Sequence, residues 1–244
     1  MIGNVNTRDI DVLILCGGKG KRLKALVSDR PKPMAEVNKK PFLDILLEHI
    51  SSFGFKRVIL CTGYMAGYIE TYYKNKFSDL NILFSAEKGP LGTAGGVKNA
   101  EGILKSNPFL VMNGDSICRV DLKKFFSFHI NKKALSSIAL ADINDASDYG
   151  SVSIDKENRI LSFIEKHGSG SSYVNAGVYF LDKSILSLIR KNEKTSLEKD
   201  IFPMLAKSNR FYGFTTKEKL FDIGTPDRFN SICGMESLRG RHGK

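Results

Sequence analysis

Three glycines and three cations stand together near the start of the chain, in Gly17-Gly18-Lys19-Gly20-Lys21-Arg22. They follow the apolar residues 12–16, which have the pattern of a buried strand. A loop of this kind has little side-chain bulk and many free backbone N–H groups, so it can wrap closely around a polyanion. Arg22 and the later Lys32 would supply fixed positive charge for a triphosphate. The loop therefore predicts a nucleotide site at the start of the fold.

This loop fails the common phosphate-binding fingerprints. A dinucleotide-binding fingerprint needs a third glycine, where this chain has Leu23. A P-loop needs Ser or Thr after a Gly-Lys pair, and neither Gly-Lys pair in the loop is followed by one. The GxxG loop of a KH domain joins two helices, whereas this loop leaves a strand. The non-functional alternative is a basic surface turn.

Asp115 and Asp222 are candidate metal ligands. Asp115 follows an apolar strand pattern, and Asp222 follows another short apolar stretch far along the chain. Mg²⁺ prefers one or two carboxylates together with phosphate oxygens. Each aspartate taken alone could instead be a turn or helix-capping residue, the role for which Asp121 and Thr225 are suited.

Strand and helix patterns alternate in the first half of the chain. Strand patterns cover residues 12–16, 57–62, 81–85 and 108–112, and helix patterns cover residues 41–53, 65–77 and 93–105. This alternation of strands and helices predicts an α/β fold with a mainly parallel sheet and ligands at the carboxyl ends of the strands. Arg22, Glu87 and Asp115 follow three of these strands, so we expect them at one edge of the sheet.

The second half is richer in strands. Strand patterns occur at residues 135–141, 150–154, 160–165 and 173–181, and helix patterns at residues 183–191, at 197–207 and after Thr225. The polar residues 166–172 are expected to form a mobile loop. We predict one domain over residues 1–244, with a mainly nucleotide-binding half at 11–115, a second-substrate half at 116–230 and a tail at 231–244.

Composition and charge favour small anionic partners. The 244 residues are 42% hydrophobic, which suffices for one large domain, and the net charge of +11 favours nucleic acid or phosphorylated small molecules. The cations are dispersed, without a long basic run interleaved with aromatics, so no nucleic-acid partner is expected. Four separated cysteines predict reduced packing residues. A polar start and the lack of a run of about 18 apolar residues predict a cytoplasmic protein with no membrane partner.

Eight motifs together resemble those of the sugar-1-phosphate nucleotidyltransferases. Their order and spacing match over residues 11–230. They are Gly17-Gly18-x-Gly20-x-Arg22-Leu23, Pro31-Lys32-Pro33, Pro90-Leu91-Gly92-Thr93-Ala94-Gly95-Gly96, Asn113-Gly114-Asp115, Tyr149-Gly150, Glu165-Lys166, Asn175-Ala176-Gly177 and Phe221-Asp222-Ile223-Gly224. The resemblance implies a Rossmann-like, GT-A-like fold with an inserted β-rich sugar-binding portion. It also implies transfer of a nucleotidyl group from an NTP to a sugar 1-phosphate, with release of pyrophosphate.

Residue roles follow from the resemblance. Arg22 would grip the triphosphate, Lys32 would lie against the α-phosphate, and Asp115 and Asp222 would hold Mg²⁺ as the cofactor. Lys166 would bind the phosphate of the sugar phosphate. The other nucleotide-binding residues implied are Leu15, Gly17, Gly18, Gly20, Glu87, Gly92 and Thr93, and the sugar hydroxyls would be bracketed by Gly150, Glu165, Asn175 and Gly177. The alternative for Glu165 and Lys166 is a surface pair on an exposed strand.

Glu87 bears on the nucleotide base. A carboxylate can accept from guanine N1–H and N2–H₂ together, two adjacent donors that uracil and thymine lack. This favours GTP, although Glu87 and Lys88 could also be a solvent-facing pair. The length and residues 28–37 and 196–203 most resemble the D-glycero-α-D-manno-heptose-1-phosphate guanylyltransferases, which supply GDP-heptose for surface polysaccharides.

Several alternatives stay open at this point. A mannose-1-phosphate guanylyltransferase, or a uridylyl- or thymidylyltransferase acting on another hexose 1-phosphate, would use the same motifs. A non-catalytic nucleotide or sugar-phosphate sensor on this fold would be expected to lose a metal aspartate or Lys166, and this chain keeps them. The sugar and the oligomeric state are open, with a homodimer among the alternatives.

Overall fold

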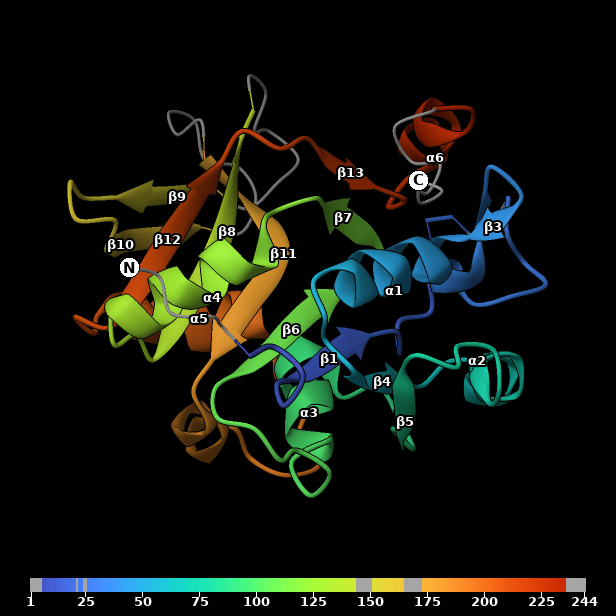
Figure 1. Ribbon diagram of the computed structural model, residues 1–244, viewed down its shortest axis with the longest axis horizontal. Helices are drawn as coiled ribbons and strands as arrows, with labels where there is room; N and C mark the ends of the chain where they lie inside the picture. Colours follow the sequence, from blue (N-terminus) through green and yellow to red (C-terminus); the bar gives the residue numbers. More distant parts are fainter. Residues whose placement is uncertain (1–5, 21, 24–25, 144–150, 165–172, 236–244) are drawn as a thin grey trace.

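The computed structural model describes residues 6–20, 22–23, 26–143, 151–164 and 173–235 (Figure 1). In chain order the elements are β1 (Asp11–Leu15), η1 (Lys32–Met34), β2 (Glu36–Val37), β3 (Lys40–Pro41), α1 (Phe42–Ser52), β4 (Arg57–Thr62), α2 (Ala66–Tyr73), β5 (Asn81–Ala86), α3 (Gly92–Asn99), β6 (Phe109–Asn113), β7 (Ser116–Cys118), α4 (Leu122–Asn131), β8 (Ser136–Asp142), β9 (Ser151–Ile154), β10 (Ile160–Ile164), β11 (Tyr173–Leu181), η2 (Lys183–Leu188), η3 (Leu197–Ile201), α5 (Phe202–Ala206), β12 (Phe211–Thr216), β13 (Leu220–Asp222) and α6 (Pro226–Ile232).

Nine strands of the described residues form one sheet that joins the two halves of the chain. In the first half, β6, β1, β4 and β5 lie side by side and run parallel, with Val12 in register with Val58 on one side and Leu110 on the other. β11 then pairs antiparallel with β6 and leads to β8, β9 and β10, and β12 pairs parallel with β8. The predicted α/β fold, with a parallel sheet in the first half and a β-rich second half, is confirmed.

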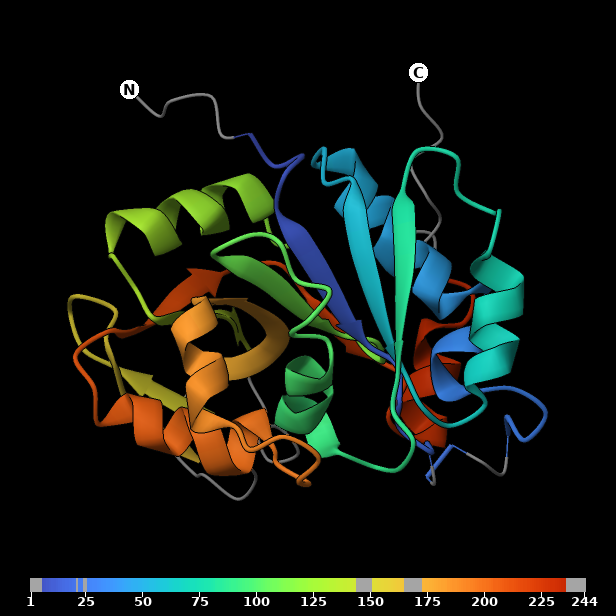
Figure 2. The ribbon, with the colours of Figure 1, turned by 90° about the horizontal axis from the view of Figure 1, so that it is seen from below.

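Helices cover both faces of the sheet (Figure 2). α1 and α4 pack on one face, and α3, η2, η3 and α5 on the other. One hydrophobic core lies under α1 and α4, and a second core lies under α3 and α5. Along β1 the side chains of Val12 and Ile14 pack in the core under α1, and that of Leu13 packs in the core under α3, because successive side chains of a strand point to opposite faces of the sheet. A parallel strand buried on both faces therefore appears in the sequence as a continuous apolar run.

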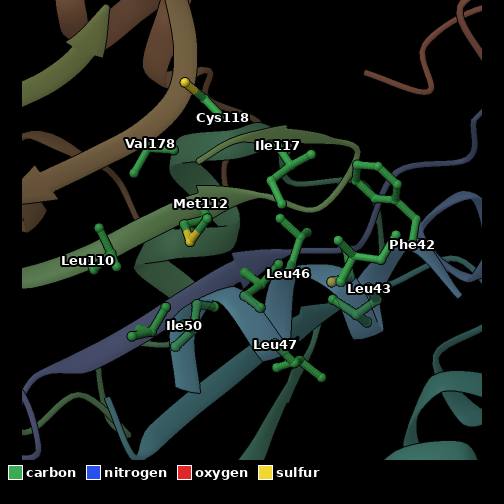
Figure 3. Close-up of a cluster of buried hydrophobic side chains, with 14 of the residues drawn as sticks. Phe42, Leu43, Leu46, Leu47, Ile50, Leu110, Met112, Ile117, Cys118 and Val178 are labelled. Atoms are coloured by element: carbon green, nitrogen blue, oxygen red, sulfur yellow. The ribbon is translucent and has the colours of Figure 1, made fainter. Parts of the chain in front are cut away.

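The α1 helix holds the strands that carry the site. Its fully buried Phe42, Leu46 and Ile50 pack with Met112 of β6 and Ile117 of β7 in one core (Figure 3). Burying each such side chain stabilises the fold by roughly 1.5–3 kcal/mol. This packing anchors β6 and β7, and the turn between those two strands carries Asp115, one of the two candidate metal ligands.

Several elements differ from their predicted form. The helix predicted at residues 183–191 is the short 3-10 helix η2. The helix predicted at residues 197–207 divides into the π-helical turn η3 and α5, because Pro203 has no N–H to continue a helical ladder through this segment. α3 ends at Asn99 rather than near residue 105. α4 was not predicted, but Asp121 caps it and Thr225 caps α6 as expected. The division of the chain at residue 115 stays a prediction.

All four cysteines are free thiols, as predicted. Cys16, Cys61 and Cys118 are buried, as expected of packing residues, whereas Cys233 is exposed after the end of α6, so the packing role predicted for it is wrong. Burial raises the pKa of Cys61 and of Cys118 to about 12, so these thiols stay protonated and act as packing groups. Among the described residues, no helix has the length and apolar character needed to cross a membrane. The predicted mobile loop at residues 166–172 lies outside the described residues.

Candidate active site

A cavity of about 1010 Å³ opens where the parallel strands end. Its walls carry Gly17 from the segment after β1, Gly63 from the segment after β4, Glu87 from the segment after β5 and Asp115 from the turn after β6. These are the carboxyl ends of the strands, the edge at which the alternating pattern predicts ligands.

Most of the predicted site residues that the structure describes line this cavity. They are Leu15, Gly17, Gly18, Gly20, Arg22, Lys32, Glu87, Gly92, Thr93, Asp115, Asn175 and Asp222. Gly177 is not among the lining residues and packs behind the wall, where a Cβ would lie 2.7 Å from Ser116 Oγ. Gly150, Glu165 and Lys166 lie outside the described residues, so their roles stay predictions.

Lys32 forms an ion pair with Asp115 inside the cavity. Its ammonium lies 2.6 Å from Asp115 Oδ2, and the lysine side chain is only 10% exposed. Pro31 and Pro33 flank Lys32 and restrict the backbone of the short helix η1. A lysine held in this way is a preorganised cation beside a carboxylate, which suits a site for phosphate groups.

The strand pair β7–β13 brings the second aspartate to the first. In this pair Asp222 is in register with Ser116, and Ile223 N–H donates to the carbonyl of Asp115 at 3.0 Å. Asp222 Oδ1 accepts from Gly224 N–H at 2.8 Å, and Arg228 Nη1 lies 3.1 Å from Asp222 Oδ2. Two carboxylates far apart in the sequence therefore face one cavity.

The two aspartates fit a magnesium ion bound together with phosphates. Among the described residues, no group of three or more His, Cys, Asp and Glu is arranged to hold a metal. Mg²⁺ needs only one or two protein carboxylates when substrate phosphates and waters complete its six ligands. Asp115 and Asp222 offer hard oxygen atoms of that kind, in the cavity that Lys32 and Arg22 also line.

Glu87 occupies a slot that glycines leave open. A Cβ on Gly17 would lie 2.2 Å from Glu87 Oε1, and a Cβ on Gly63 would lie 2.6 Å from the same oxygen. Glu87 Oε2 accepts from Leu91 N–H at 2.9 Å. Burial raises the pKa of Glu87, and the Leu91 N–H opposes that shift. Gly17 thus allows the carboxylate to approach the backbone of the first loop.

A hydrogen-bonded network forms another part of the wall. Thr93 Oγ1 donates to Glu198 Oε2 at 2.6 Å, and Ser196 Oγ donates to the same oxygen at 2.8 Å. Tyr179 OH donates to Glu198 Oε1 at 3.4 Å and accepts from Asn175 Nδ2 at 2.9 Å. The network fixes the Glu198 carboxylate and the Asn175 amide, and both side chains line the cavity.

Comparison with known proteins identifies the family. Residues 11–234 match the profile of the family described as Nucleotidyl transferase. The chain belongs to the Nucleotidyl transferase family. It is 38% identical over 220 residues to the D-glycero-alpha-D-manno-heptose 1-phosphate guanylyltransferase of Aneurinibacillus thermoaerophilus, with 90% of this chain and 95% of the relative covered. It is 32% identical over 250 residues to the mannose-1-phosphate guanylyltransferase of Mycobacterium tuberculosis, with 98% of this chain and 70% of the relative covered.

A solved relative has the same fold. The crystal structure of HddC from Yersinia pseudotuberculosis has a TM-score of 0.82 and 36% sequence identity, and the match covers 92% of this chain and 98% of that one. The same protein has also been solved in a complex with GMP-PN. The resemblance inferred from the eight motifs is therefore confirmed at the level of the family, an enzyme family of nucleotidyl transfer.

Sequence reasoning missed several residues of this nucleotidyltransferase cavity. Lys194 and Arg228, which line the cavity, were not singled out, and Glu198 was noted only as part of residues 196–203, which served to compare groups within the family. Tyr179, which is fully buried behind the wall and bonds to Glu198, was not singled out either. Their positions follow from tertiary contacts, and the only local signal is that Glu198 follows the helix-capping Ser196. Thr93 lines the cavity, and its nucleotide-binding role stays a prediction. Its hydroxyl donates to Glu198 and accepts from Leu197 N–H at 2.8 Å.

Proposed function

We propose that the chain transfers GMP from GTP to D-glycero-α-D-manno-heptose 1-phosphate, giving GDP-heptose and pyrophosphate for surface polysaccharide synthesis. The observation that carries the proposal is the placement of the Glu87 slot and the Lys32–Asp115 pair in one cavity. The names of the relatives at 38% and 32% identity, both guanylyltransferases, support the guanine base. The first of these relatives supports the heptose.

The transfer needs alignment and charge neutralisation more than a protein nucleophile. An oxygen of the sugar 1-phosphate attacks the α-phosphorus of GTP, and the bond from that phosphorus to the bridging oxygen of the β-phosphate breaks. Lys32 carries three N–H donors, so it can keep its bond to Asp115 and still donate to an α-phosphate oxygen. Arg22, which lines the cavity, would stabilise the pyrophosphate as it leaves.

Mg²⁺ is proposed as the cofactor. Held by Asp115 and Asp222, it would offset the negative charge of the phosphates during transfer. The protein contributes the orientation of the two carboxylates, because the β7–β13 pair joins their backbones. Lys32 and Arg22 supply the remaining positive charge at the same wall.

Glu87 is proposed to select guanine. Each carboxylate oxygen has two lone pairs, so Oε2 can keep its bond to Leu91 N–H and still accept from the base. The paired acceptors suit the adjacent N1–H and N2–H₂ donors of guanine. Because this role requires the ionised carboxylate, the raised pKa of Glu87 makes base recognition weaken at a higher pH than it would with an ordinary glutamate.

The sugar phosphate would bind in the part of the cavity that Glu198 and Asn175 line. Asn113 Oδ1 is buried there and has no hydrogen-bond partner among the described residues, so a sugar hydroxyl could supply the missing donor after a small adjustment. Glu165, Gly150 and the phosphate-binding Lys166 remain part of the proposed sugar site. We place the reaction in the cytoplasm.

Mannose 1-phosphate is the second candidate acceptor. The Mycobacterium tuberculosis relative, matched over 98% of this chain, is named for that sugar. The two acceptors share the phosphate and differ in the hydroxyls that the sugar-side wall must read. Both candidates use the same nucleotide chemistry, so the choice depends on the sugar-side residues alone.

A substrate screen tests the proposal. Pyrophosphate release is measured with Mg²⁺ for each of four NTPs against heptose, mannose, glucose and N-acetylhexosamine 1-phosphates. We expect the highest kcat/KM for GTP with the heptose. A preference for UTP or dTTP would overturn the guanine assignment. Absence of turnover with every pair would favour a sensor, and tight, salt-sensitive binding of nucleic acid independent of GTP would favour a nucleic-acid-binding protein.

A further inference from the structure

The Asp222 carboxylate has a cationic partner to which the proposed reaction gives no role. Arg228 Nη1 lies 3.1 Å from Asp222 Oδ2 and 3.3 Å from Asp222 Oδ1. The Asp222 side chain is 10% exposed and that of Arg228 is 24% exposed, so water screens the pair only partly. Both residues line the cavity.

The local fold holds Arg228 in place. α6 begins at Pro226, directly after the segment that follows β13, and Thr225 Oγ1 accepts from Arg228 N–H at 3.4 Å. This cap sets the first turn of the helix so that Arg228 returns to the carboxylate of the strand that precedes it. Gly224 N–H holds the other side of the same carboxylate at 2.8 Å from Oδ1. Asp222 is thus clamped from two directions.

The two candidate metal ligands are alike in this respect. Asp115 is paired with Lys32, and Asp222 is paired with Arg228. A divalent cation that approaches the two carboxylates alone therefore meets two fixed positive charges. A nucleoside triphosphate brings about four negative charges to the same wall, so it offsets the repulsion between these cations and the metal.

We propose that Arg228 is a positioning residue that orients Asp222 and keeps the affinity for a divalent cation low until the nucleotide is bound. The metal and the triphosphate then enter the site together rather than in sequence. This inference rests on the proposed function and deepens it, because it assigns a residue that controls the binding of the metal to that same site.

Direct metal binding tests this role. Mn²⁺ affinity is measured by titration with detection of free Mn²⁺ by electron paramagnetic resonance, first on the protein alone and then with a non-hydrolysable GTP analogue. We expect Arg228→Gln to bind Mn²⁺ alone at least about fivefold more tightly than the wild type, because a fixed like charge is removed. A damaged fold would weaken binding instead, so the direction of the change separates the two explanations.

Matched variants complete the experiment. Arg228→Lys keeps the charge, and its Mn²⁺ affinity should stay within about twofold of the wild type. Arg159→Gln removes an arginine that pairs with Asp155 at 2.8 Å in the β9–β10 hairpin and does not line the cavity, so it should leave Mn²⁺ binding unchanged. Arg228→Met, which keeps the aliphatic stem, replaces the Gln variant if the latter does not fold.

Three outcomes overturn the inference. One is equal or weaker Mn²⁺ binding by Arg228→Gln in a protein that melts like the wild type. Another is an Arg228→Lys variant that behaves like Arg228→Gln, which would show that charge is not the cause. The third is a wild type that binds no Mn²⁺ even with the nucleotide analogue, which would remove the proposed metal site as well. The first two leave the proposed function intact.

Discussion

Asp115 and Asp222 are joined through their backbones. The carbonyl of Asp115 accepts from the N–H of Ile223, the residue after Asp222, at 3.0 Å. Because this bond extends the pairing of β7 with β13, the separation of the two carboxylates is set by the sheet register and not by flexible loops. A site built in this way can hold two charged groups in a constant relative position.

Neutralising either aspartate should abolish the Mg²⁺-dependent reaction. We expect Asp115→Asn and Asp222→Asn each to lower kcat by at least about 100-fold, because an amide is a poor ligand for a hard cation. Pyrophosphate release measures the rate, and circular dichroism checks the fold. Asp227→Asn is the matched control, since this exposed aspartate lies on α6 and does not line the cavity. Wild-type rates in both site variants would refute the metal assignment.

Glu87→Gln should change the nucleotide preference. An amide offers one acceptor where the carboxylate offers two, so guanine loses a charge-assisted hydrogen bond worth roughly 1.5–3 kcal/mol. We expect kcat/KM for GTP to fall by about 10- to 100-fold relative to UTP and dTTP. Steady-state kinetics with the three nucleotides measure the ratio. An unchanged ratio would exclude Glu87 from base selection.

The same carboxylate predicts the pH dependence of GTP binding. Burial raises the pKa of Glu87, so the side chain is protonated at a higher pH than an ordinary glutamate. The ionised form accepts from the base, and KM for GTP should therefore rise as the pH falls through this raised pKa. KM for GTP is measured between about pH 4.5 and pH 8, because a glutamate with a raised pKa titrates above the usual value of about 4.3. A wild-type profile that persists in Glu87→Gln would assign the titration to another group.

Glu198→Gln should weaken binding of the sugar phosphate. The carboxylate is oriented by Thr93 and Ser196 on one oxygen, and its other oxygen is held more loosely by Tyr179 at 3.4 Å. Losing a charged acceptor for sugar hydroxyls should raise KM for the sugar phosphate about tenfold and leave KM for GTP unchanged. Glu193→Gln, an exposed glutamate of the preceding segment, is the control. A rise in KM for GTP alone would move Glu198 to the nucleotide side.

Gly92→Ala should destabilise the fold. The φ of Gly92 is +75°, and a Cβ there would lie 2.5 Å from the carbonyl oxygen of Thr195. That carbonyl accepts from Ala94 N–H at 3.0 Å, so it cannot move without disturbing the start of α3. We expect the free energy of unfolding to fall by about 2 kcal/mol in urea titrations. Gly102→Ala, where no atom lies within 4 Å, should change it by less than about 0.5 kcal/mol.

The parallel half of the fold was readable from local patterns. The strand predicted at residues 57–62 is β4 with the same bounds, and β1, β5 and β6 differ from their predictions by one residue at the ends. A strand buried on both faces shows its apolar run whatever it packs against, so the pattern is local. The predicted positions of Glu87 and Asp115 at the strand ends followed directly from that reading.

Other elements were not readable in this way. α4 carries exposed Ile130 on one side and buried Phe125 on the other, and only packing decides which apolar residues face the core. The π-helical turn η3 depends on the capping Ser196 and on Pro203 beyond it, together with the contacts of α3. In both segments, tertiary contacts override the local helix preference of the sequence.

The type of chemistry was predictable from the amino-acid sequence alone, because the glycine–cation loop, Lys32 and the two aspartates have few roles outside a phosphate site. The arrangement of these groups around one cavity became clear only in the folded chain. The backbone bond between Ile223 and Asp115 and the network from Thr93 through Glu198 to Tyr179 join segments that lie far from one another in the sequence. The physical reason is that strand register and helix packing are long-range: they depend on backbone hydrogen bonds and buried contacts between distant segments, which no local pattern encodes.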